Sequence, residues 1–160
     1  LAGSPARPRA AGTSAAARAL LRSRELWATI DVCNAPDQPN VLGVRGSMPG
    51  DAQAHDTMYM RFRLQYLDKT TMRWVNLAAS GASTPFLAVG GGASSRQDGS
   101  SFVIAPVAGQ PAFMLRGVVA FQWRRGRTVL ESITRPTTAG HQALAGADPA
   151  GFSAASCQIG

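Results

Sequence analysis

Apolar and polar side chains alternate along residues 58–66. The apolar positions are Met58, Met60, Phe62, Leu64 and Tyr66, and between them lie Tyr59, Arg61, Arg63 and Gln65. An amphipathic helix repeats its apolar positions every three or four residues, whereas a strand with one buried face repeats them every two. The stretch therefore predicts a β-strand. Residues 68–71 are turn-forming and predict a hairpin to a return strand over residues 72–77.

A second alternating stretch, residues 113–124, predicts another strand. One face carries Phe113, Leu115, Gly117, Val119, Phe121 and Trp123, and the other carries Met114, Arg116, Val118, Ala120, Gln122 and Arg124. Arg125 and Gly126 predict the turn that follows, since glycine supplies the positive φ of a type II turn. Residues 128–135 then return antiparallel and end at Pro136.

The rest of the chain predicts further short strands separated by turns. Residues 26–33 alternate and predict a strand with one buried face, and shorter strands are expected at 41–45, 86–89 and 102–104. We expect residues 46–51, including Ser47, to form a sharp turn, and residues 137–152 to form a loop. A last strand within residues 153–159 would lie beside the first. No stretch predicts a long helix, so the fold class is an all-β, antiparallel sandwich of about seven to nine strands.

The N-terminal residues differ in composition from the rest. Residues 1–25 are rich in Ala, Arg, Pro, Gly and Ser, which predicts a flexible arm or linker with at most a helical turn or two near residues 15–24. Residues 26–160 are expected to form the β-sandwich domain. No apolar run approaches the length of a membrane span. Because the chain starts at Leu1, we expect that any export signal or anchor has been removed upstream.

The two cysteines, Cys33 and Cys157, lie near the two ends of the expected domain. Zinc sites and thioredoxin-like sites use closely spaced cysteines, which this chain lacks. We therefore expect a disulfide between them, in place of two unrelated buried thiols. A disulfide in turn predicts a secreted or cell-surface protein, because disulfides persist in oxidising compartments.

Three segments together resemble a fibronectin type III-like or immunoglobulin-like domain. They are MRFRLQYLDKTTMRWVNL at residues 60–77, SSFVIAP at 100–106 and FMLRGVVAFQWRRGRTVLESITRP at 113–136. The resemblance implies that the first segment holds the C strand and its partner, and that the last is the F–G hairpin. It also places the strands with the arginines side by side in one sheet. The usual inter-sheet cysteine pair is missing, and the fold by itself selects no function.

The positive charge divides unevenly along the chain. The net charge of the whole chain is +7, of which residues 1–25 carry +4 and residues 26–160 carry +3. Nucleic-acid binding needs a concentrated basic face and is not predicted from so mild a charge. Only Lys69 among the 16 cationic residues is not arginine. With the abundance of Ala and Gly, this indicates a high-GC genome, such as that of an actinobacterium.

Arginines gather on one predicted sheet surface. Arg61 and Arg63 share a face of their strand, and Arg116 and Arg124, with Gln122, share a face of theirs. Arg73, Arg127 and Arg135 could extend this stripe, and Val118, Val129 and Ile133 could be exposed within it. Guanidinium groups form bidentate contacts with carboxylate, phosphate or sulfate, so we hypothesise an anion-binding face. The alternative is a solvated sheet surface whose arginines reflect codon bias and protect the sheet edge.

Catalytic and metal signals are weak. His55 and His141 are expected in loops, and His55, Asp56 and His141 lack the spacing of a zinc site. Ser47 does not fit the G-x-S-x-G pattern, and Gly90–Gly92 are not followed by a helix that could hold a phosphate. We therefore predict no cofactor and no metal. The expected function is a non-catalytic exported or cell-envelope domain that contacts a protein or an anionic polymer. The alternative is an accessory domain of an envelope hydrolase, or an enzyme that uses His55 or His141.

Overall fold

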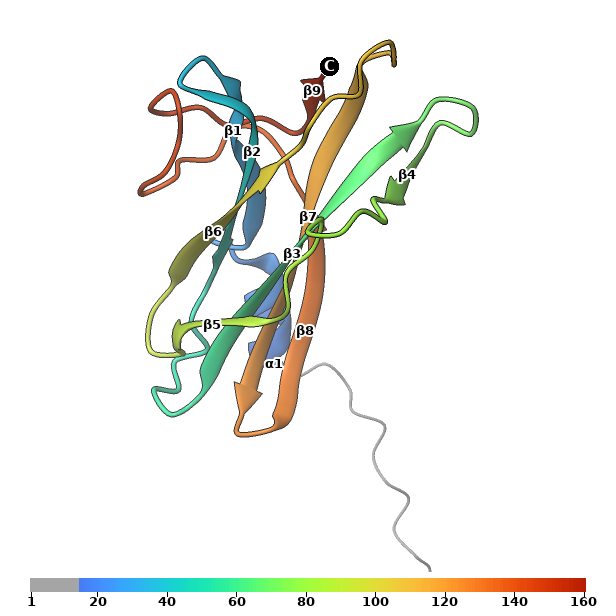
Figure 1. Cartoon of the computed structure of the whole chain (residues 1–160). Coiled ribbons are helices and arrows are strands. Elements are labelled where there is room, and N and C mark those ends of the chain that lie inside the picture. The colour runs from blue at the N-terminus through green and yellow to red at the C-terminus, as the bar shows by residue number, and fades with distance from the viewer. Residues whose placement is uncertain (1–14) are drawn as a thin grey trace, which may run out of the picture.

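The computed structural model describes residues 15–160 and shows a mainly β protein (Figure 1). These described residues form one helix, α1 (Ala15–Arg22), followed by nine strands. The strands are β1 (Trp27–Ala35), β2 (Gln38–Met48), β3 (Thr57–Asp68), β4 (Arg73–Asn76), β5 (Leu87–Gly91), β6 (Arg96–Val103), β7 (Phe113–Arg125), β8 (Thr128–Pro136) and β9 (Cys157–Ile159). The expected arm lies partly in residues 1–14, outside the described residues.

The strands form two antiparallel sheets. The smaller sheet has the order β1-β2-β6, and the larger has the order β4-β3-β7-β8, with β5 added to β3 and β9 added to β7. The larger sheet is strongly curled, like half of a barrel. One edge of β3 is shared by β5, by a bridge between Arg63 and Ser83, and by β4. Segments on three different parts of the chain therefore border the same strand.

The core confirms the predicted alternation. Met58, Met60, Phe62 and Leu64 on β3 are fully buried, as are Leu115, Val119, Phe121 and Trp123 on β7. They pack against the inner side chains of the smaller sheet, including Ile30, Leu42 and Val44. Burying such side chains gives the fold most of its stability, roughly 1.5–3 kcal/mol for each.

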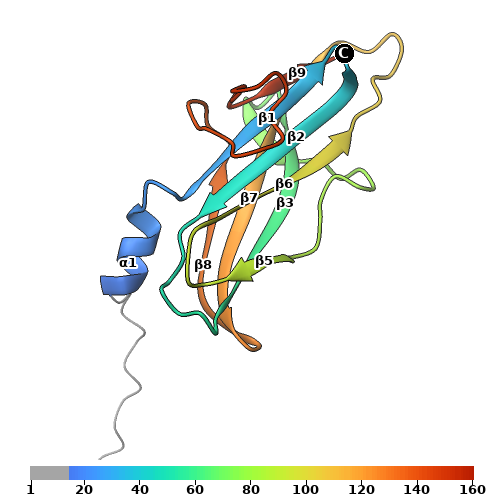
Figure 2. The same cartoon turned by 90° about the vertical axis from the view of Figure 1, so that its left-hand side faces the viewer.

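β1 is buried on both faces, so its predicted single buried face is wrong. Thr29 and Asp31, on the side away from the core, are 0% and 4% exposed. Residues 137–155 run over β1 (Figure 2), and their backbone bonds to the edge of this strand. Ile30 and Ala154 exchange two backbone hydrogen bonds of 2.9 and 3.0 Å, and the Thr138 N–H donates to Ala28 at 2.8 Å. The segment expected to be a loop is therefore packed against β1, and we call residues 137–155 the cover.

β2 is longer than predicted, because Gly46 does not end it. Gly46 pairs with Ala28 and faces the core, where an added Cβ would lie 2.9 Å from Met60 Sδ and 3.0 Å from Phe121 Cε1. Both distances are too short for a carbon neighbour, so glycine lets the two sheets approach each other here. Ser47 consequently lies within a strand and not on a sharp turn.

The predicted disulfide is confirmed. Cys33 on β1 and Cys157 on β9 are bonded, with 5.6 Å between their Cα atoms. The prediction that the last segment lies beside the first strand holds for Ala154, which forms a bridge with Ile30 of β1, whereas β9 itself pairs with β7 through Leu115 and Cys157. The bond therefore joins the two sheets. It also indicates an oxidising environment, where such bonds persist.

The helix α1 lies to one side of the β-structure, before the start of β1 (Figure 2). Leu20 and Leu21 are partly buried against the core, whereas Arg18 and Arg22 are exposed. The Arg135 guanidinium donates a hydrogen bond of 3.4 Å to the Leu21 carbonyl oxygen and so fixes the end of the helix to β8. No helix in residues 15–160 is long and apolar enough to cross a membrane.

Candidate functional site

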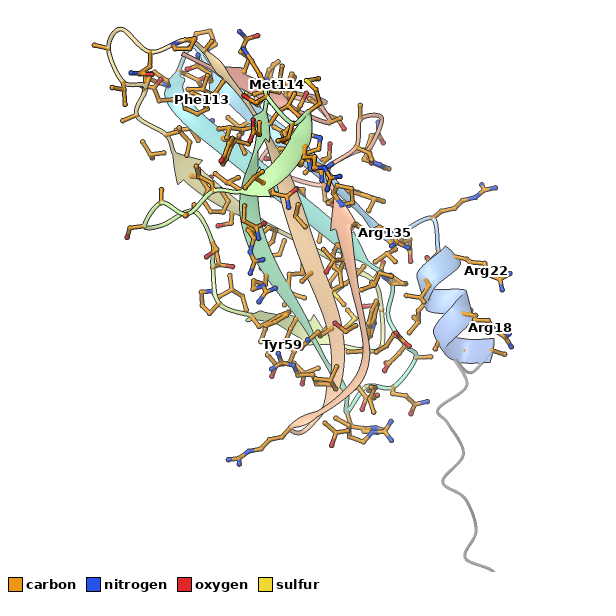
Figure 3. The ribbon with its side chains drawn as sticks, turned by 90° about the vertical axis from the view of Figure 1, so that its right-hand side faces the viewer. Arg18, Arg22, Tyr59, Phe113, Met114 and Arg135 are labelled. Atoms are coloured by element: carbon orange, nitrogen blue, oxygen red, sulfur yellow. A yellow bond between two sulfur atoms is a disulfide. The ribbon has the colours of Figure 1, made fainter. Side chains whose placement is uncertain are left out.

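The predicted arginines lie together on the outer surface of the larger sheet. In the register of β3 and β7, Arg61 is opposite Ala120, Arg63 is opposite Val118, Gln65 is opposite Arg116 and Thr57 is opposite Arg124. Side chains opposite each other in an antiparallel pair point to the same side. We call the surface formed by Arg61, Arg63, Arg116 and Arg124 the arginine face. In Figure 3, which views this side, Tyr59 and Met114 mark the two ends of the outer surface.

Aromatic rings hold three of these guanidinium groups. Arg61 and Arg124 both lie over the ring of Phe86, at 4.9 and 5.0 Å from its centroid. Arg124 also lies 4.1 Å above Tyr59, and Arg116 lies 4.7 Å above Trp74. A cation over an aromatic ring is attracted to the negative charge of the ring face. The rings therefore orient the guanidinium groups without neutralising their charge.

Side-chain amides hold two of these guanidinium groups, those of Arg116 and Arg124. Arg116 Nε donates to Gln65 Oε1 at 2.8 Å, and Gln65 Nε2 donates to Asn76 Oδ1 at 3.0 Å. Arg124 Nε donates in the same way to Gln122 Oε1 at 2.8 Å. These bonds use the Nε–H of each arginine and leave its terminal nitrogens for other acceptors. An arginine has five N–H donors in a fixed plane, so the remaining ones are already oriented.

Among residues 15–160, no carboxylate forms an ion pair with the arginine face. The ion pairs of the described residues are Arg45–Asp31, Arg125–Asp56 and His55–Asp56. Burial lowers the pKa of Arg61, and the neighbouring charge of Arg63 adds to this effect; burial also lowers the pKa of Arg116. Arginine remains charged at neutral pH, so the face carries positive charges that repel one another.

The arginine face is hollowed at its centre. A depression of about 190 Å³ is lined by Arg61, Arg63, Gln65, Asn76 and Thr134. Val118 and Ala120 also border it and provide small apolar surface between the strands. The depression thus offers two positive charges and three uncharged hydrogen-bonding side chains. This combination suits an anionic group that also carries hydroxyls.

Several residues proposed to extend the stripe lie elsewhere. Arg135 pairs with the buried Val119 and reaches α1 (Figure 3). Ile133 pairs with Phe121 and packs against the core. Arg73 is opposite Asp68 at the far end of the β3–β4 hairpin, and Arg127 lies in the β7–β8 turn. Val129 does border the face, opposite Arg124, and is 45% exposed.

Sequence patterns did not predict the aromatic residues that lie against the arginines, Tyr59, Trp74 and Phe86. Tyr59 shares the parity of Arg61 and Arg63, which is a signal in the sequence itself. Phe86 and Trp74 come from the segment before β5 and from β4. Whether these two rings meet the arginines depends on the register in which their segments pair with β3. The register of short, exposed strands cannot be predicted from the sequence.

The two histidines lie in different surroundings. His55 Nε2 is 3.5 Å from Asp56 Oδ1, but both Asp56 oxygens accept hydrogen bonds from Arg125, at 2.8 and 3.1 Å. His141 Nε2 is 2.7 Å from Thr138 Oγ1, and the ring stacks on Trp27. Within residues 15–160, no group of three or more His, Cys, Asp or Glu side chains is placed to hold a metal ion.

We expect Asp56→Asn to destabilise the protein at neutral pH but not in acid. The Arg125 guanidinium lowers the pKa of the Asp56 carboxyl below its ordinary value of 3.8. A carboxylate with a lowered folded pKa stabilises the fold above its unfolded pKa, and this contribution is lost as the pH falls through the folded pKa. Urea unfolding at neutral pH and at about pH 2.5 measures the difference.

Asp51→Asn is the matched control for that experiment. Burial and a hydrogen bond with Asp56 raise the pKa of Asp51, so its charged form does not stabilise the fold at neutral pH in the same way. The Asp51 variant should lose less stability at neutral pH than the Asp56 variant. An equal loss for Asp56→Asn at both pH values would contradict the assignment.

Comparison with known proteins identifies no family for this chain. No protein-family model matches the sequence, and no curated protein or solved structure is significantly similar to it.

Proposed function

We propose that this protein is a non-catalytic, immunoglobulin-like β-sandwich domain that binds an anionic polymer of the cell envelope through the arginine face. The observation that carries the proposal is the group of arginines Arg61, Arg63, Arg116 and Arg124 on one surface, with no carboxylate partner in the described part of the chain. Like charges on neighbouring strands cost stability unless something neutralises them. A bound polyanion would supply the missing negative charge.

The orientation of the guanidinium groups supports this proposal. Rings and amides hold Arg116 and Arg124 before any ligand binds. Binding then loses less side-chain entropy, which is an advantage for a preorganised site. Arg116 and Arg124 donate these internal bonds through Nε. Their terminal nitrogens are therefore available for bidentate contacts to carboxylate, phosphate or sulfate.

The length of the face favours a polymer over a small anion. The positions on β3 opposite Arg124 and Arg116 are Thr57 and Gln65. Eight residues of strand span roughly 26 Å. A single small ion would contact one part of this surface, whereas an extended chain with repeated negative groups can contact all of it.

The disulfide supports a secreted or cell-surface location. It closes a long loop, with a sequence separation of 124 residues, and such structural bonds are typical of exported proteins. The two antiparallel sheets and the long β7–β8 hairpin agree with the immunoglobulin-like assignment. An envelope polymer would be accessible to a protein in this location.

Charge reversal tests the proposal. Arg61→Glu combined with Arg116→Glu should weaken binding of polygalacturonate or dextran sulfate by at least about tenfold for each reversal, because each removes a charge-assisted contact. The affinity of the unaltered protein should also fall as the salt concentration rises. Isothermal titration calorimetry at several salt concentrations measures both effects.

The control variant is Arg18→Glu with Arg22→Glu, which changes the net charge equally on α1. Both side chains are exposed and project away from the sheets (Figure 3). This variant should bind as tightly as the unaltered protein. An equal loss of affinity in both variants, binding to neutral dextran, or no binding to either polyanion would overturn the proposal. Tighter binding of polyglutamate than of both polysaccharides would point to a protein partner and contradict it as well.

A further inference from the structure

A second cavity lies on the opposite side of the molecule from the arginine face. It has a volume of about 310 Å³ and is bordered by the start of β1, by β2, by the β5–β6 turn and by the C-terminal cover. The cavity is lined by residues of the β1-β2-β6 sheet, such as Trp27, Ser47 and Gln97. The arginine face belongs to the other of the two sheets in Figure 1. The two surfaces share no residue.

The aromatic wall of this cavity is held in a fixed position. Trp27 stacks on His141 with 4.7 Å between the ring centroids and an angle of 6° between the planes. His141 is itself held by Thr138 Oγ1 at 2.7 Å and by its backbone N–H, which donates to Ser153 Oγ at 3.1 Å. Burial lowers the pKa of His141, which favours the neutral ring in the stack. The indole is thus oriented before any ligand arrives.

Residues 142–144 of the cover, which border the cavity, are hydrogen-bonded to Gln97 on β6. The Leu144 N–H donates to Gln97 Oε1 at 2.9 Å, and Gln97 Nε2 donates to the Gln142 carbonyl oxygen at 3.3 Å. These bonds connect the cover to β6. The cavity wall therefore consists of segments that are joined by hydrogen bonds.

The polar groups around Trp27 are mixed in character. Glu25 provides an acceptor, Arg96 provides donors, and Ser47 and Gln142 provide both. Neither Glu25 nor Arg96 takes part in an ion pair of the described residues. One acid and one base leave the cavity without a net charge, in contrast to the arginine face.

We propose that this cavity binds a sugar ring of a neutral glycan. A pyranose has an apolar C–H face that packs on an aromatic ring, and hydroxyls that both donate and accept hydrogen bonds. His141 covers one face of the Trp27 indole, so the sugar ring would pack on the opposite face. The acid, base, hydroxyl and amide groups around the indole match the hydroxyls of the sugar. The volume lies near the lower end of the range of small-molecule sites, which suits one sugar ring. The domain then has two ligand surfaces on opposite sides and could connect an anionic polymer to a neutral glycan.

Saturation-transfer NMR with single sugars tests this site. Glucose, galactose, mannose and N-acetylglucosamine serve as probes, and at least one should bind with a Kd of about 1 mM, a common strength for a small uncharged ligand. Trp27→Ala should weaken that binding at least tenfold. Trp74→Ala is the matched control, because Trp74 lies under Arg116 on the other sheet, and it should leave sugar binding unchanged.

A second variant guards against a loss of fold. Glu25 is exposed and its side chain lies at the rim of the cavity, so Glu25→Ala should weaken sugar binding while the thermal unfolding temperature stays the same. The proposal is overturned if no sugar gives saturation transfer, or if the sugar signal survives in both Trp27→Ala and Glu25→Ala. The charge reversals at Arg61 and Arg116 should not affect sugar binding, so the two proposed surfaces can fail independently.

Discussion

Removal of the Cys33–Cys157 disulfide should lower the free energy of unfolding by about 4–5 kcal/mol, because the bond restricts a long loop in the unfolded chain. The two cysteines are separated by 124 residues, which places the effect near the upper end for a single bond. Single domains have a total stability of about 5–15 kcal/mol. The variant Cys33→Ala with Cys157→Ala should therefore unfold at a much lower urea concentration, as measured by circular dichroism.

The position of the bond adds a local effect. β9 is short and pairs with residues 113–115 of β7. Without the bond, hydrogen exchange should become faster first in β9 and in the adjoining end of β7. Chemical reduction of the unaltered protein is the control, since it keeps both side chains in place. The explanation fails if the reduced protein and the double variant unfold at the same urea concentration as the oxidised protein.

The long strands could be predicted because their side chains alternate. Every second residue of β3 from Met58 to Leu64 is fully buried, and the same is true of β7 at Leu115, Val119, Phe121 and Trp123. A period of two assigns each side chain to a face without knowledge of its neighbours. The arginines of the candidate site were therefore placed on the correct surface from parity alone.

The covering segment could not be predicted, because its contacts are made by the backbone. Residues 137–155 bury the outer side of β1 through hydrogen bonds to Ala28, Ile30 and Asp31. Alanine, glycine and threonine provide little apolar surface, so the sequence of this segment has no periodic pattern. The cover also explains why the buried Asp31 is found beside Arg45, at 2.9 Å: a charge removed from water needs a partner.

The strands with which the short strands pair also could not be predicted from sequence patterns. β9 has three residues and joins β7, although its cysteine is bonded to β1. Phe86 meets two arginines only because β5 and the residues before it follow β3 in one particular register. The outer surface of the larger sheet is polar, and a register is weakly specified where no apolar face has to be buried.

Trp123→Ala should destabilise the protein by about 3–5 kcal/mol, the usual cost of removing a large aromatic side chain from a core. Trp123 is fully buried on β7, and its Nε1–H donates to the Pro49 carbonyl oxygen at 2.9 Å. The variant also loses this hydrogen bond, which adds about 1 kcal/mol. Urea unfolding followed by circular dichroism measures the change.

Trp74→Ala removes the same side chain from the outer surface of the same sheet and separates the core from the candidate site. Trp74 is half-buried and lies 4.7 Å from the Arg116 guanidinium, a contact worth about 0.5–1 kcal/mol at an exposed site. Its unfolding should therefore change little, whereas binding of polygalacturonate should weaken because Arg116 is less well oriented. Similar destabilisation by Trp74→Ala and Trp123→Ala would show that the Trp74 side chain stabilises the fold as much as a core side chain does. Unchanged polyanion binding in Trp74→Ala would show that the aromatic rings do not prepare the arginine face for its ligand.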